Sequence, residues 1–192
     1  DDKQSCEPRG LEPCCNCRKG NYNLCQNFTE GTLSPGTIMG SCADTGGSWG
    51  EYYVAHKSRL FRVPAKLKDE EAILTDPLSS ALHPVLKDMP KDDERILVIG
   101  AGIIGLLLTR VLRVLGSKAD ITVLARHSYQ AELAEKFGAS RVVRSGNIEK
   151  MAEITNAKVI KPVLGDKFLI GGFDRIYDCV DSAGSIGNSV KW

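Results

Sequence analysis

Five of the seven cysteines lie within the first 25 residues of the chain, and three of them have the spacing of metal ligands. Cys14 and Cys17 form a C-x-x-C pair, and seven residues separate Cys17 from Cys25. Thiolates at such spacing are typical ligands of zinc, and the odd number of cysteines favours metal binding over a framework of disulfide bonds. The sequence therefore predicts a structural metal site in this region.

A closed structural zinc site needs a fourth ligand. A further C-x-x-C step would place that ligand at position 11, which is Leu11 and cannot bind zinc. Cys6 is the replacement that we expect, because the intervening segment 7–13 contains proline and glycine and can loop out. Cys15 competes with Cys14 for one place, and the spacing leaves that choice open. The predicted ligands are Cys6, Cys14, Cys17 and Cys25.

A glycine-rich loop lies between a nearly continuous apolar strand, predicted over 95–99, and an apolar helix, predicted over 103–115. In a G-x-G-x-x-G loop at this place, the glycines allow a tight turn, close approach of a pyrophosphate, and close packing of helix on strand. The N–H groups at the helix start attract phosphate. A purely structural glycine turn is the alternative. The predicted cofactor contacts are Gly100, Gly102, Ile103, Ile104 and Gly105.

The end of the second predicted strand indicates which dinucleotide the loop would hold. A domain that selects NAD places Asp or Glu there, whereas this chain has Ala125, Arg126 and His127. A guanidinium can bind a phosphate in bidentate fashion. Arg126 and His127 therefore favour NADP, with NAD as the second choice and a solvated strand end as the structural alternative.

The hydrophobic pattern changes along the chain. Residues 1–64 are rich in Gly, Pro, Asn and Ser and predict loops with short strands at 51–55 and 60–63. Alternating strands and helices from residue 95 onward predict an α/β fold with part of a doubly wound parallel sheet. The other expected elements are helices from residue 69 and over 77–87, 129–137 with Ser128 as N-cap, and 148–155, strands over 121–124, 141–143 and 175–180, and an irregular stretch over 161–172.

Composition excludes several classes of function. The 25 basic and 24 acidic residues give a net charge of +1, with no long run of either sign, so neither nucleic acid nor an anionic membrane is an expected partner. A nucleic-acid-binding zinc domain is accordingly disfavoured. No apolar stretch is long enough to span a bilayer. Metal thiolates indicate a reducing compartment, and we expect the cytoplasm. Cys42 and Cys179 are expected to be small buried residues.

In combination, these motifs resemble the zinc-dependent medium-chain dehydrogenases and reductases, which include alcohol, sorbitol and threonine dehydrogenases. The resemblance spans nearly the whole chain. It implies the end of a GroES-like, β-rich catalytic domain over 1–76, carrying the zinc lobe, followed by the first part of a Rossmann domain over 77–192. The motifs that carry it are Pro13 to Cys25, Gly46 to Tyr52, Val63 and Pro64, Asp76 to His83, the glycine loop, and Phe137 to Ala139.

The resemblance also implies a catalytic zinc, held by a Cys and a His expected before residue 1 and by a third ligand just before the cofactor domain. Asp76 occupies that third position and is both a predicted metal ligand and a predicted catalytic residue; it could also cap the helix after Pro77. His56 and His83 are expected to be structural. With the remaining cofactor strands expected after residue 192, the chain corresponds to an internal fragment of such an enzyme.

By resemblance, the parent enzyme transfers hydride between NAD(P) and a small alcohol, aldehyde or ketone, with zinc as the Lewis acid. The fragment alone is expected to be inactive, and the intact enzyme could form a homo-oligomer. The alternative is a non-catalytic, zinc-stabilised NADP-binding module that acts as a sensor or binds a partner.

Overall fold

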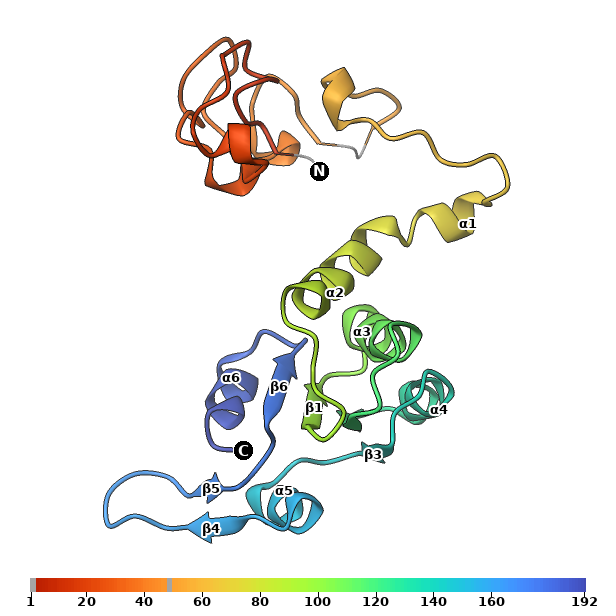
Figure 1. Ribbon diagram of the computed structural model, residues 1–192, viewed down its shortest axis with the longest axis vertical. Coiled ribbons are helices and arrows are strands. Elements are labelled where there is room, and N and C mark those ends of the chain that lie inside the picture. Colours follow the sequence, from red (N-terminus) through yellow and green to blue (C-terminus); the bar gives the residue numbers. More distant parts are fainter. Residues whose placement is uncertain (1–2, 48–49) are drawn as a thin grey trace. The chain divides into compact units, whose positions relative to one another are not determined.

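The computed structural model describes residues 3–47 and 50–192, which form two compact units, Asp1–Lys66 and Leu67–Trp192 (Figure 1). The division falls earlier than the expected limit after residue 76. The reason is that helix α2, Thr75–Lys87, packs against helix α3, Ile103–Val114, and so groups the preceding short helix α1, Asp69–Ala72, with the second unit.

The first unit consists of loops and short 3-10 turns. The strands expected at 51–55 and 60–63 are not formed, and this prediction was wrong. A strand requires a neighbour to satisfy its backbone groups, and in the described part of this unit the only ladder contact is an isolated bridge between Lys3 and Ile38. Apolar side chains of the two segments are exposed instead, Tyr52 by 91% and Phe61 by 77%. The 3-10 turns are Cys17–Lys19, Tyr22–Leu24, Met39–Ser41 and Lys57–Arg59.

A fully buried arginine organises the first unit. The Arg9 guanidinium donates five hydrogen bonds, all to backbone carbonyl oxygens, at 2.7–3.2 Å. It therefore joins loop segments that share no regular secondary structure. It also provides a hydrogen-bond donor to backbone carbonyl groups that are not paired within a β-sheet. The acceptors are the carbonyls of Gln4, Glu30, Leu33, Ser34 and Gly36.

We expect Arg9→Lys to destabilise the first unit by about 2 kcal/mol, because an ammonium keeps the charge but cannot reach five fixed acceptors as the planar fork does. Amide hydrogen exchange, read on peptides from 30–36, should show a loss of protection. The control is Arg18→Lys, since the exposed Arg18 donates a single hydrogen bond, to the carbonyl of Pro13. Equal protection in the Arg9 and Arg18 variants would contradict the expectation.

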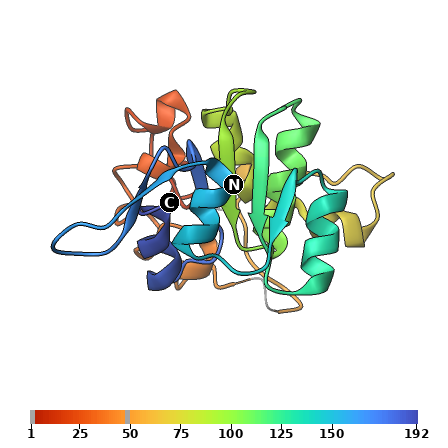
Figure 2. The ribbon, with the colours of Figure 1, turned by 90° about the horizontal axis from the view of Figure 1, so that it is seen from below.

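The second unit contains a four-stranded parallel sheet in the order β3-β2-β1-β6 (Figures 1 and 2). This is the predicted α/β fold with part of a doubly wound sheet. The chain builds outward from β1 through β2 to β3 and then crosses to the other side of β1, which creates the switch point where ligands bind in such sheets. The strands are β1, Arg95–Ile99, β2, Asp120–Leu124, β3, Arg141–Val143, and β6, Arg175–Asp178.

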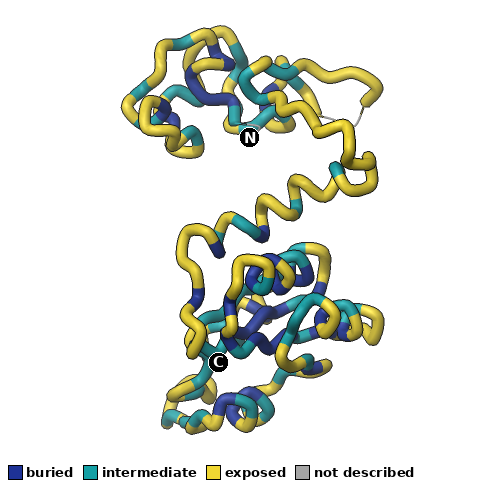
Figure 3. Tube along the Cα trace, turned by 45° about the vertical axis from the view of Figure 1, so that its right-hand side comes forward, coloured by how far each residue is buried: buried dark blue, intermediate teal, exposed yellow. Residues whose placement is uncertain are grey.

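Two hydrophobic clusters cover the two faces of this sheet, because successive side chains of a strand point to opposite faces. On one face, Ile96 and Val98 of β1 pack with residues of α2, α3 and α4, Ser128–Lys136. On the other, Leu97 and Ile99 pack with Met151 of α5, Ile148–Thr155. The two central strands, β1 and β2, are consequently among the most buried parts of this unit (Figure 3). Within the described residues, no helix is long and apolar enough to cross a membrane.

Local differences from the expected elements have simple physical causes. Ser128 is not the N-cap of α4; it is the first helical residue, and His127 holds the N-cap position. The stretch expected to be irregular contains β5, Phe168–Ile170, which pairs antiparallel with β4, Lys158–Ile160. Strands of three residues are too short to show a period. Helix α6, Ala183–Ser189, was not predicted because its two glycines disfavour a helix.

Candidate metal and dinucleotide sites

The first unit brings the four predicted sulfur ligands together. The Sγ atoms of Cys6, Cys14, Cys17 and Cys25 all lie within 4.8 Å of one another. None of the seven cysteines forms a disulfide. Four sulfurs at the usual distance from one tetrahedral zinc would lie about 3.8 Å apart. The donor set and its spacing therefore fit a closed structural zinc site.

The turns of the chain place these sulfurs. The Leu11 N–H donates to the carbonyl of Cys6, so segment 7–13 folds back and brings the Cys14 N–H to 3.3 Å from the sulfur of Cys6. Cys17 opens one 3-10 turn, and Cys25 directly follows another. The side chain of Leu11 packs on the cluster as an apolar neighbour. Position 11 thus contributes packing, and Cys6 supplies the sulfur.

Asn27 is a further polar neighbour of the cluster. Its backbone N–H donates to the sulfur of Cys25 and its Nδ2 donates to that of Cys6, both at 3.3 Å. Sequence reasoning did not identify this residue, because no ligand spacing marks a residue that acts through hydrogen bonds to sulfur. Donors aimed at sulfur stabilise the thiolate form that zinc requires.

The environments of the sulfurs differ. Hydrogen bonds from the backbone N–H groups of Gln26 and Cys17 lower the pKa of Cys14 to about 6, so this thiol ionises near neutral pH. Burial raises the pKa of Cys17 to about 12 and also raises the pKa of Cys25. A cation among the sulfurs would offset this cost, because a metal deprotonates its thiol ligands.

The structure also separates Cys15 from Cys14. Cys15 is exposed and its Sγ lies 3.4 Å from Oε1 of Gln26, outside the cluster. Cys42 is buried as expected, whereas Cys179 is only partly buried. Cys179 follows β6, and burial raises its pKa to about 11, so its thiol is neutral at physiological pH.

Asp76 lies exposed in the first turn of α2. It is not the N-cap, because Leu74 holds that position, so the capping interpretation was wrong. Across residues 3–47 and 50–192, no group of three or more metal-ligating side chains includes Asp76, and its role as a catalytic zinc ligand stays a prediction. Nδ1 of His56 hydrogen-bonds to Ser58, the structural role expected of this residue. His83 is exposed, and its expected packing on the helix stays a prediction.

The glycines of the loop in the second unit differ in the space around them. Gly100 has φ +93°, and a Cβ there would lie 2.5 Å from Val180. A Cβ on Gly105 would lie 1.9 Å from the carbonyl oxygen of Gly100, so only glycine lets α3 approach the strand so closely. At Gly102, by contrast, a Cβ meets nothing within 4 Å. The open space lies where a ligand would approach the backbone.

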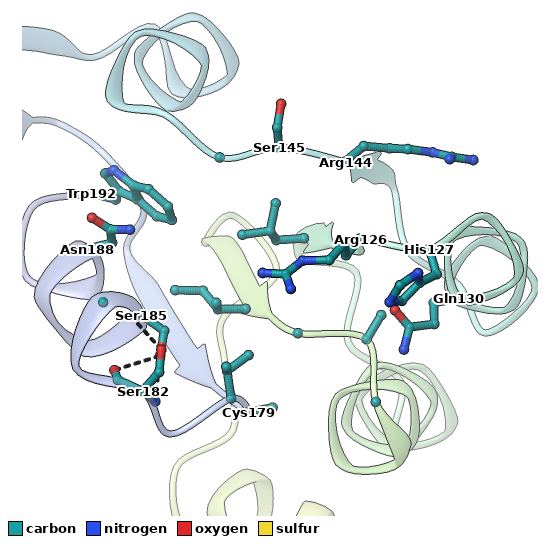
Figure 4. Close-up of a pocket in the computed structure, with 18 residues that line it drawn as sticks. Arg126, His127, Gln130, Arg144, Ser145, Cys179, Ser182, Ser185, Asn188 and Trp192 are labelled. Carbon is teal, nitrogen blue, oxygen red and sulfur yellow. Dashed lines mark hydrogen bonds between the residues drawn. The ribbon is translucent and has the colours of Figure 1, made fainter.

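A cavity of about 690 Å³ opens beside this loop, at the carboxyl ends of the parallel strands (Figure 4). Of the predicted cofactor contacts, Gly100, Gly102, Arg126 and His127 line it, while Ile103 and Ile104 begin the adjoining helix α3, whose first N–H groups have no acceptor within the helix. The described residues of the lining include two arginines and no Asp or Glu, so the cavity suits an anionic ligand.

Several lining residues were not identified from the sequence. Arg144 and Ser145 follow β3, and Arg126 lies two residues beyond β2, so a basic residue near the end of each strand was the available signal. The residues contributed by α6 and the chain beyond it could not be found, because that helix was not predicted. They include Ser185, Asn188 and Trp192.

A Rossmann-type sheet with a glycine loop beside a cavity, preceded in the sequence by a lobe of four clustered cysteines, is typical of the class of zinc-containing, dinucleotide-dependent dehydrogenases. No family model matches the chain. Among curated proteins, it is 33% identical over 142 residues to L-threonine 3-dehydrogenase of Pectobacterium atrosepticum, a match covering 73% of this chain and 36% of that enzyme. With the Shewanella sp. enzyme of that name it shares 31% over 162 residues, covering 84% and 41%.

Two solved structures extend the comparison. A protein described as a short chain alcohol dehydrogenase from E. coli, complexed with NADH, has 26% identity and a TM-score of 0.64, covering 95% of this chain and 46% of that one. A protein from Sinorhizobium meliloti described as a zinc-binding dehydrogenase, bound to NADP, has 26% identity and a TM-score of 0.64, covering 97% and 47%. The homologues of the chain are thus L-threonine 3-dehydrogenases and zinc-binding dehydrogenases of the medium-chain dehydrogenase/reductase type. The chain spans less than half the length of these relatives.

Proposed function

We propose that this chain supplies the cofactor-binding sheet and the structural zinc lobe of an oxidoreductase that transfers hydride between NADP or NAD and a small alcohol or carbonyl compound. The observation that carries the proposal is the glycine loop, with open space at Gly102 beside a cavity whose described lining has two arginines and no carboxylate. The identities to L-threonine 3-dehydrogenases support it, and they make L-threonine the first alcohol to test.

Each part of the chain has a role in this proposal. The N–H groups at the start of α3 bind the pyrophosphate, with Gly102 permitting its approach and Gly100 and Gly105 holding the helix on the strand. Arg126 and His127 line the cavity after β2 and favour NADP over NAD. When bound, the dinucleotide carries the hydride and a catalytic zinc polarises the oxygen of the substrate.

The four clustered cysteines hold a structural zinc in this proposal, and the exposed Asp76 is the proposed third ligand of a catalytic zinc. The 192 residues alone are not expected to turn over substrate, because two further ligands of that zinc are missing and the reacting groups are then not held in place. A non-catalytic NADP-binding module remains the alternative. A longer form of this protein that oxidises L-threonine or another alcohol would distinguish the two.

Cofactor binding can be tested on the 192-residue chain itself. Trp192 is 8% exposed and lines the cavity, so NADPH bound there should accept energy from its excited indole and fluoresce. We expect saturable binding of NADPH to the wild type and none to Gly102→Asp. The carboxylate of the variant would occupy the open space beside residue 102 and repel the pyrophosphate. Gly187→Ala is the control, since a Cβ there also meets nothing within 4 Å and the residue does not line the cavity. Failure of the wild type to bind would reject the proposal.

A further inference from the structure

Arg126 and Arg144 leave neighbouring strands at the same edge of the sheet. Leu124 and Val143 are paired in the parallel ladder of β2 and β3, and the N–H of Ala125 donates to the carbonyl of Val143 at 2.8 Å. Arg144 is the next residue after β3, and Arg126 is two residues beyond the end of β2. Both line the cavity, and in Figure 4 their side chains extend in different directions from these strand ends.

Neither guanidinium has a protein partner in the described structure. Both side chains are exposed, and no hydrogen bond or ion pair holds either one, so both are free to turn toward a ligand. Two other arginines of this unit are engaged: Arg113 donates to the carbonyl of Gly138, and Arg141, on β3, forms an ion pair with Asp120. The described lining of the cavity holds no carboxylate that would satisfy Arg126 or Arg144. The charge of this pair is therefore available to an anion.

We propose that Arg144 is a second specificity-determining residue for NADP, which binds the 2′-phosphate together with Arg126. The inference rests on the proposed function, and it adds a residue from β3 to the one that follows β2. In such sheets the adenosine ribose lies at the end of the second strand, so its 2′-phosphate falls beside both strand ends. A phosphate dianion can occupy two guanidinium forks, whereas the ribose hydroxyl of NAD offers no charge to pair with them.

The test compares 2′,5′-ADP with 5′-AMP, two probes that differ by this phosphate alone, in calorimetric titrations of the full chain. We expect the wild type to bind 2′,5′-ADP at least about tenfold more tightly. Arg144→Gln should weaken 2′,5′-ADP about tenfold and change 5′-AMP less than about twofold, and Arg144→Lys should restore part of the loss. Arg141→Gln is the matched control, because it removes an arginine of β3 that does not line the cavity.

Each result has a distinct meaning. Equal weakening of both probes by Arg144→Gln would overturn the inference, because the residue would then act on the shared part of the nucleotide or on the fold. No preference of the wild type for 2′,5′-ADP would also overturn it, while the proposed dinucleotide function would stand. If the wild type bound neither these probes nor NADPH, the proposed function itself would fail. Thermal unfolding of each variant establishes that the sheet is intact.

Discussion

Cys17→Ser is expected to release zinc and to unfold the first unit, while the second unit keeps its structure. Cys17 is 8% exposed and its sulfur lies within 4.8 Å of three others, so a hydroxyl there leaves three thiols around an incomplete site. Binding of zinc to a structural site is worth roughly 10–16 kcal/mol and is coupled to folding. The first unit offers few regular hydrogen-bonded elements to compensate.

The measurement combines metal analysis with amide hydrogen exchange resolved by peptide. For the wild type we expect one zinc per chain and protected amides around Arg9 and the cysteines, and for Cys17→Ser neither. Cys15→Ser is the matched control, because the exposed Cys15 lies two residues from Cys17 and outside the cluster. Zinc retained by Cys17→Ser, or lost equally by Cys15→Ser, would show that the ligand set is wrong. Chelation of the wild type should reproduce the exchange pattern of Cys17→Ser.

Gly105→Ala is expected to cost about 3 kcal/mol or more of the unfolding free energy of the second unit and to weaken NADPH binding at least about hundredfold. The added Cβ would lie 1.9 Å from the carbonyl oxygen of Gly100, and both groups belong to backbone that cannot turn aside. Helix α3 must then move away from β1. Its N–H groups would move with it, and their aim at the pyrophosphate would be lost.

Denaturant unfolding followed by circular dichroism measures the stability, and energy transfer from Trp192 measures binding. The control is Gly187→Ala, in α6, where a Cβ meets nothing within 4 Å. Because alanine is the better helix former, this variant should gain about 0.5–1 kcal/mol. A loss below about 0.5 kcal/mol in Gly105→Ala would contradict the close packing of helix and strand at this glycine.

Much of the second unit could be predicted because its signals are local. The nearly continuous apolar run 95–99 became β1 with those limits, and 148–155 became α5. A strand covered on both faces is almost entirely apolar, and a helix repeats its apolar residues every three or four positions. Each pattern can therefore be recognised without knowing which elements pack against it. The glycine loop could be predicted for the same reason, because its motif lies within a few consecutive residues.

Other features depended on contacts between distant residues. Tyr52 and Phe61 lie in strand-like segments that formed no strands, since a strand is defined by its neighbour and not by its own side chains. The buried position of Arg9 follows from carbonyl groups of residues 30–36, far along the chain. The choice of Cys14 over Cys15 was likewise left open by spacing. Two adjacent residues lie almost equally far along the chain from the other cysteines, and only the folded backbone decides which side chain points toward them.

The amino-acid sequence alone therefore predicted the chemistry: soft sulfur atoms suited to a metal, a glycine loop suited to phosphate, and a basic residue where NAD-specific domains have an acid. Its residue types and short spacings carry that information directly. Folding specified which groups meet. Arg144 joins Arg126 only because β3 lies beside β2, and Asn27 reaches the sulfurs of Cys6 and Cys25 only because the loop returns on itself. Such proximities arise from chain closure and packing, which no local pattern encodes.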